Sequence, residues 1–152
     1  EIKRLQDWFL KNEPTDDYRW KKYWWKNNAF MRDHLIQLFS DSYEIVGSHY
    51  SKSIECPVIK TTYKGVEIIW QYNFYDWQIM VKSEKPLVFE NLSIFNADGD
   101  YLFYQGIPEN YQFKKYSKEN NKQFAIDIYS NDLMEIFPFA LELRRAIDRA
   151  YN

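Results

Sequence analysis

The chain has 152 residues, of which 45% are hydrophobic and 20% aromatic, and its formal net charge is −2. This length suits one domain with its own core, and the apolar content excludes a wholly disordered chain. We therefore expect one globular domain over residues 1–152. With only 4 glycines, the chain has no glycine-rich phosphate loop. The single cysteine, Cys56, excludes an intrachain disulfide, which favours a reducing, cytoplasmic compartment.

The N-terminal part of the chain is predicted to form two amphipathic helices. Apolar residues recur at helical spacing over residues 2–11, and Pro14 ends this helix because the residue before a proline is pushed out of helical geometry. The second helix is predicted from Asp16 to Phe39. Its apolar stripe, which we expect to be buried, contains Trp20, Trp24, Met31, Leu35 and Leu38. The opposite side, which we expect to be exposed, contains Arg19, Lys22 and Lys26.

Alternating apolar and polar residues then predict a sheet. Strands are expected over residues 43–50, 53–63, 66–73 and 77–82, with Pro57 marking an edge or a bulge. Lys64-Gly65 and residues 74–76 are predicted turns. Shorter strands are predicted over residues 92–95 and 101–104, with a hairpin loop between them, and a final strand over residues 123–129. Residues 106–122 are predicted to be a loop.

A C-terminal helix is predicted from Asp132 to about Ala150. Asp132 and Glu135 have the spacing of an N-cap and its N3 partner, and Pro138 implies a kink or a short first turn. Arg144 precedes Asp148 by four residues, which favours an ion pair across the rim of the core, with a partner contact as the alternative. The predicted fold class is α+β: two N-terminal helices, an antiparallel meander sheet of five or six strands, and one C-terminal helix packed on the same face.

No motif in the sequence is characteristic of a particular enzymatic reaction. His34, His49 and Cys56 lack the spacing of a metal site, and the loop NADGD (96–100) lacks the glycine position of a calcium loop. We therefore expect no metal and no cofactor. The longest apolar runs are far too short to span a membrane. An enzyme whose active site is assembled from distant residues stays open, because such geometry leaves no local pattern.

The charge is unevenly distributed along the chain. Residues 40–113 contain ten acidic and five basic side chains, for a net charge of −5, whereas residues 114–122 have a net charge of +3. An acidic surface attracts basic proteins and repels phosphate. We therefore predict a non-catalytic protein-binding module of inhibitor, immunity or adaptor type, whose partner is a protein with a basic surface. The expected contact residues around the 66–77 hairpin are Glu67, Tyr72, Tyr75, Asp76 and Trp77.

The alternative interpretation is nucleic-acid binding through the basic side of the second helix and the 114–122 loop. Its phosphate-contacting residues would be Arg19, Lys22, Lys26, Lys114, Lys115 and Lys118. The acidic pI of about 5.7 argues against it, because nucleic-acid-binding domains usually have a basic excess. A third interpretation is a small-ligand pocket lined by aromatic residues, but the sequence does not indicate which residues would form it.

Overall fold

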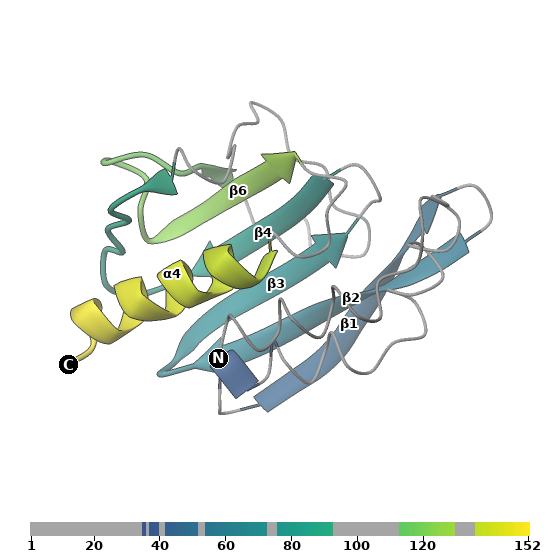
Figure 1. The fold of residues 1–152 in the computed structure, drawn as a ribbon, viewed down its shortest axis with the longest axis horizontal. Coiled ribbons are helices and arrows are strands. Elements are labelled where there is room, and N and C mark those ends of the chain that lie inside the picture. Colours follow the sequence, from purple (N-terminus) through teal and green to yellow (C-terminus); the bar gives the residue numbers. More distant parts are fainter. Residues whose placement is uncertain are drawn as a thin grey trace.

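The structure, a computed structural model, describes residues 35, 37–39, 42–51, 54–72, 76–92, 113–129 and 136–152. Within these ranges it also leaves the side chains of residues 42, 47–51, 54–57, 72, 76 and 129 undescribed. The described residues form a six-stranded sheet with the helix α4 (Ile136–Ala150) lying across one face of it (Figure 1). α4 is the one complete helix in this part of the chain.

The strands of this sheet are β1 (Ser42–Ser51), β2 (Ile54–Tyr63), β3 (Val66–Tyr72), β4 (Asp76–Lys82), β5 (Lys114–Lys115) and β6 (Gln123–Tyr129). Their spatial order is β1-β2-β3-β4-β6-β5. Every neighbouring pair is antiparallel except β5 and β6, which are parallel. The sheet is therefore mixed, and among the described strands β1 and β5 form its two edges (Figure 1).

The predicted turn at Lys64-Gly65 is confirmed, and its backbone explains the tight β2–β3 hairpin. Lys64 and Gly65 have φ angles of 49° and 81°. A two-residue turn of this kind needs positive φ at both central positions, which matches the right-handed twist of the flanking strands. The turn brings Tyr63 directly opposite Val66 and so fixes the register of the whole hairpin.

The main core lies between the sheet and α4. Ile68 is directly opposite Thr61 on β2 and Val81 on β4, and residues opposite one another share a face of a sheet. This face contributes buried side chains from β2, β3, β4 and β6, and α4 contributes Ile136, Phe137, Phe139, Ala140, Leu143, Ala146 and Ile147. The indole of Trp70 lies at the centre, 5.6 Å from the ring of Phe39 and 6.4 Å from that of Phe139.

The opposite face of the sheet is also buried in part. Gln71, Gln78 and Asp127 are directly opposite one another across β3, β4 and β6, and all three are buried. Met80 and Ala125, which form the next row, are buried as well. The sequence pattern predicted this face as the polar one, so alternation identified the two faces correctly without showing that both are covered.

The predicted fold class is wrong, and the sheet is the clearest reason. The expected antiparallel meander is contradicted by β5, which pairs in parallel with residues 124–125 of β6 and lies outside β6 at the sheet edge. Residues 106–122 had been predicted as loop, because a strand of two lysines is too short to show an alternating pattern.

Two N-terminal helices are not seen among the described residues. The helix predicted over residues 2–11 lies outside them, and of the helix predicted from Asp16 to Phe39 only Leu35, Gln37 and Leu38 are described as helical. Leu35 and Leu38 are buried, as predicted. The predictions for Trp20, Trp24, Lys22 and Lys26 fall outside the described part of the chain, and so does the hairpin predicted over residues 92–104, apart from Leu92.

The structure explains the positions of two prolines, Pro138 and Pro57, that were expected to interrupt regular secondary structure. Pro138 lies in the first turn of α4, where a missing N–H costs no intrahelical hydrogen bond. Pro57 lies opposite Ser48 of β1, but β2 pairs with β3 only over Ile59–Tyr63. Pro57 therefore occupies a part of β2 that has a strand neighbour on one side, which agrees with its prediction as an edge residue.

Candidate functional site

The residues predicted to contact a partner at the 66–77 hairpin do not share one environment. Trp77 is fully buried, because it is directly opposite Ile128 and lies on the same face as Ile79 under α4. It is a core residue, which corrects its assignment to a contact surface. Glu67 is partly exposed on the opposite face. Tyr72 and Asp76 lie in β3 and β4 with undescribed side chains, and Tyr75 lies outside the described residues.

The predicted phosphate-contacting lysines lie on an ordered turn at the β5 edge. Lys114 and Lys115 form β5, and Lys118 follows in the turn to β6; all three are exposed. The side-chain amide of Asn120 donates to the carbonyl oxygens of Lys114 and Lys115, at 2.9 Å and 3.0 Å. Arg19, Lys22 and Lys26 lie outside the described residues. The described part of the chain therefore contains only Lys114, Lys115 and Lys118 of the predicted site.

The strand β1 has the most prominent apolar exposure in the described part of the chain. Tyr43 and Ile45 expose 44% and 55% of their surface. They lie opposite Thr61 and Ile59, so both project from the α4 face of the sheet. The side chain of Glu44, between them, is 58% exposed and projects from the other face. We call Tyr43, Glu44 and Ile45 the β1 edge surface.

Charged side chains on the face of the sheet opposite α4 form an alternating row that ends in Glu44 at the β1 edge surface. Lys60 lies directly opposite Glu44, and its ammonium is 2.7 Å from Glu44 Oε1 and 3.5 Å from Glu67 Oε1. The hydrogen bond to Glu44 is the main cause of a raised pKa at Lys60, opposed by partial burial of the amine and supported by the charge of Glu67. Lys82 of β4 lies directly opposite Glu67, so two carboxylates and two lysines alternate across β1 to β4, and this row ends at the sheet edge in the carboxylate of Glu44.

The two edges of the sheet are protected to very different degrees. Natural sheets blunt their edges with short strands, lysines, prolines or bulges, because an edge strand offers backbone groups to any other strand. β5 is two residues long, and both are lysines. β1 is ten residues long, SYEIVGSHYS, and contains no lysine, arginine or proline. Its protective devices among the described features are the exposed charge of Glu44 and the irregularity in register between Ile45 and Gly47.

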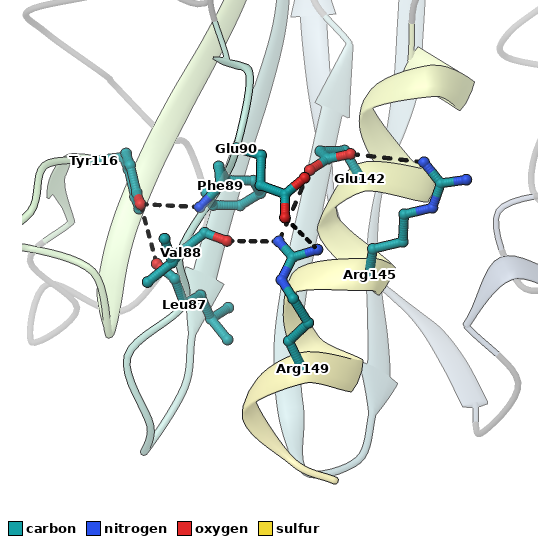
Figure 2. Close-up of polar contacts among 8 residues, drawn as sticks. All are labelled: Leu87, Val88, Phe89, Glu90, Tyr116, Glu142, Arg145 and Arg149. Atoms are coloured by element: carbon teal, nitrogen blue, oxygen red, sulfur yellow. Dashed lines mark hydrogen bonds and ion pairs between the residues drawn. The ribbon is translucent and has the colours of Figure 1, made fainter.

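Val88 is the third exposed large apolar residue of the described chain, at 61%, and its surroundings differ from those of β1. Arg149 of α4 donates from Nη2 to the carbonyl oxygen of Val88 at 2.8 Å, and its other nitrogen, Nη1, is 3.7 Å from Glu90 (Figure 2). The hydroxyl of Tyr116 donates to the carbonyl oxygen of Leu87 on the same segment (Figure 2). Val88 is thus a single exposed side chain on a fixed segment, which is common on soluble proteins, whereas Tyr43 and Ile45 form a pair on an edge strand.

Neither a metal centre nor a membrane span is found in the described residues. No group of three or more His, Cys, Asp or Glu side chains among them is placed to hold a metal ion. None of their helices is both long and apolar enough to cross a membrane.

Comparison with known proteins finds no match, so the site is interpreted from its geometry. No family model, no curated protein and no solved structure matches the chain. Sequence reasoning missed the β1 edge surface because it predicted a strand over residues 43–50 without its place in the sheet. The signal that was available is the scarcity of charge in SYEIVGSHYS, whose one charged residue at neutral pH is Glu44.

Proposed function

We propose that the protein is a non-catalytic protein-binding module of inhibitor, immunity or adaptor type, and that the β1 edge surface is its contact site in place of the 66–77 hairpin. The observation that supports this most directly is the pair of half-exposed apolar side chains, Tyr43 and Ile45, on a long edge strand. Completely burying an isoleucine side chain contributes roughly 1.5–3 kcal/mol, so the half that remains exposed on Ile45 offers about 1 kcal/mol to a partner. Tyrosine is among the residues most enriched at the centres of protein interfaces.

Electrostatics supports a partner with a basic surface. The outermost charge of the row at the β1 edge surface is the carboxylate of Glu44, and the whole of residues 40–113 has a net charge of −5. A field of this sign speeds the encounter with basic proteins and slows the encounter with nucleic acids. Binding should therefore weaken as salt concentration rises, mainly through the association rate.

A second candidate function, phosphate contact, is favoured by one specific observation. Lys114, Lys115 and Lys118 are exposed on a turn whose backbone is held by Asn120. Two facts weigh against it: the pI is about 5.7, and lysines at a short edge strand are the usual protection of a sheet edge. We therefore rank it below protein binding.

The experiment that separates the two candidates compares one double variant at each edge of the sheet. Tyr43→Thr with Ile45→Thr removes the exposed apolar pair, and Lys114→Thr with Lys115→Thr removes two cations; threonine suits a strand in both places. Each protein, with wild type as reference, is used to capture partners from a native lysate, with and without nuclease, and melting temperatures confirm folding. We expect the first variant to lose a nuclease-resistant partner that the second keeps. Loss of a nuclease-sensitive partner by the second variant alone would contradict the proposal and support phosphate contact.

A further inference from the structure

We infer that the β1 edge surface binds its partner by strand addition, and that the added segment has a basic residue flanked on both sides by apolar residues. This inference rests on the proposed function and specifies the partner. It begins with the backbone: in a strand, alternate N–H and C=O groups point to opposite sides. β2 satisfies one side of β1, and no described strand pairs with the other side.

The stretch of β1 best suited to accept a strand is Ser42–Ile45. These residues pair with β2 in unbroken register, and their partners in β2, Ile59–Thr62, pair in turn with β3. After Ile45 the register shifts, and from Gly47 onward the ladder of β1 and β2 continues beyond the end of the β2–β3 pairing (Figure 1). A strand added at Ser42–Ile45 would therefore extend a continuous, multi-stranded sheet and not an isolated ribbon.

The side chains of β1 define what the added segment contains. Residues directly opposite one another in neighbouring strands share a face and lie close together. Apolar residues of the partner would therefore lie against Tyr43 and Ile45 on the α4 face, and the residue between them would lie opposite Glu44 on the other face. Because the row of alternating charges ends at the sheet edge in the carboxylate of Glu44, the residue that continues the alternation is lysine or arginine.

Glu67 allows Glu44 to accept this second cation. Lys60 is 2.7 Å from Glu44 and 3.5 Å from Glu67, so it stays paired with Glu67 if Glu44 turns toward the incoming residue. The complex would then extend the row of alternating charges by one cation beyond Glu44.

The same charge argues against a second copy of the chain as the occupant. An antiparallel pairing of two β1 strands that places Tyr43 of one copy opposite Ile45 of the other also places the two Glu44 side chains directly opposite each other. Like charges in that position destabilise a pair of strands, and the lysine beside each Glu44, Lys60 of β2, is shared with Glu67. A segment with a basic residue at this position meets no such repulsion.

The test selects linear peptides from a random library on the wild-type protein, with the Tyr43→Thr, Ile45→Thr double variant for counter-selection. We expect selected peptides to share an apolar-basic-apolar pattern. Glu44→Lys should lower their affinity by about fivefold to tenfold, and replacing the peptide's basic residue with glutamate should restore binding to that variant. Methylating the peptide's backbone nitrogens one at a time should abolish binding at every second position and leave the others nearly unaffected, because only one side of an added strand faces β1.

The outcomes that would overturn the inference are distinct from those that would overturn the proposed function. Peptides that need Tyr43 and Ile45 but show no two-residue period on N-methylation would exclude strand addition while leaving a protein-binding site in place. A library that yields no peptide dependent on these residues would exclude recognition of a linear segment. Self-association that the double variant abolishes, seen by sedimentation, would identify a second copy as the occupant. Unchanged capture of partners by the double variant would remove the proposed function itself.

Discussion

Asp148 connects the β2–β3 turn to the C-terminal end of α4, and we predict that its contribution to stability depends on pH. Its Oδ1 accepts a hydrogen bond from the hydroxyl of Tyr63 at 2.7 Å and lies 2.8 Å from the ammonium of Lys64. Arg144 is 3.8 Å away on the same helix and lies over the Tyr63 ring, which confirms the ion pair predicted from the i,i+4 spacing. Partial burial acts to raise the pKa of Asp148, but the hydrogen bonds from Lys64 and Tyr63, together with the charge of Arg144, outweigh it and lower the pKa.

We expect Asp148→Ala to lower the free energy of unfolding at neutral pH by about 1–2 kcal/mol. A hydrogen bond to a charged acceptor contributes roughly 1.5–3 kcal/mol, and the lower figure applies because Asp148 itself is partly exposed and its ion pairs are screened by solvent. For a domain of this size each kcal/mol corresponds to about 2–4 °C in melting temperature. Because the pKa is lowered on folding, this stability is present above the unfolded pKa of about 3.9 and is lost as the pH falls through the folded value.

The assay is urea denaturation of wild type and Asp148→Ala across this pH range, with Tyr63→Phe as the matched control. Tyr63→Phe keeps the buried ring and removes only the hydroxyl, so a double-mutant cycle with Asp148→Ala isolates their coupling, which we expect to be about 1 kcal/mol. A gap between wild type and Asp148→Ala that stays constant from neutral pH to well below the unfolded pKa would refute the electrostatic argument. A coupling energy of zero would refute the role of the Tyr63 hydroxyl.

Three further predictions follow from packing and backbone geometry. Trp77→Ala should cost about 3–5 kcal/mol, measured by chemical denaturation, because the side chain is fully buried; a surface contact residue would cost far less. Gly65→Ala should cost about 1 kcal/mol in melting experiments, entirely from its φ of 81°, because an added Cβ would meet nothing within 4 Å; Gly65→Asn should cost less, since asparagine tolerates this conformation. Tyr116→Phe should lower the free energy of unfolding by about 1 kcal/mol. It should also increase amide hydrogen exchange at Phe89, because the Tyr116 hydroxyl accepts a hydrogen bond from the Phe89 N–H.

The local parts of the fold were predictable because each depends on a short stretch of sequence. Val66, Ile68 and Trp70 alternate with less buried residues, and the structure buries all three. Lys64-Gly65 has the turn chemistry that a two-residue hairpin requires. The burial of Trp77 was also available from sequence, because Trp77, Ile79 and Val81 alternate on one face, and assigning Trp77 to a contact surface ignored that periodicity.

The long-range parts were not predictable, because no local pattern encodes which strands are neighbours. β4 and β6 are paired along their whole length although a long segment of chain separates them. Their pairing buries Gln78 opposite Asp127, on the face of the sheet opposite α4. β5 is a strand only because Lys114 and Lys115 meet β6, and two lysines have no intrinsic preference for a strand.

The candidate site depends on this same division between local and long-range information. The composition of β1, with one charged residue at neutral pH and no proline, is typical of a strand with neighbours on both sides, and read alone it predicts an interior position. Among the described strands, the topology places β1 at an edge. A sequence that specifies a fold normally agrees with it at every level, and the exceptions concentrate where function sets the composition. The other edge of the same sheet has the expected protection, two lysines on a very short strand, so the fold does protect an edge where pairing would be harmful. Under the proposed function, β1 has no lysine or proline because a partner strand pairs there.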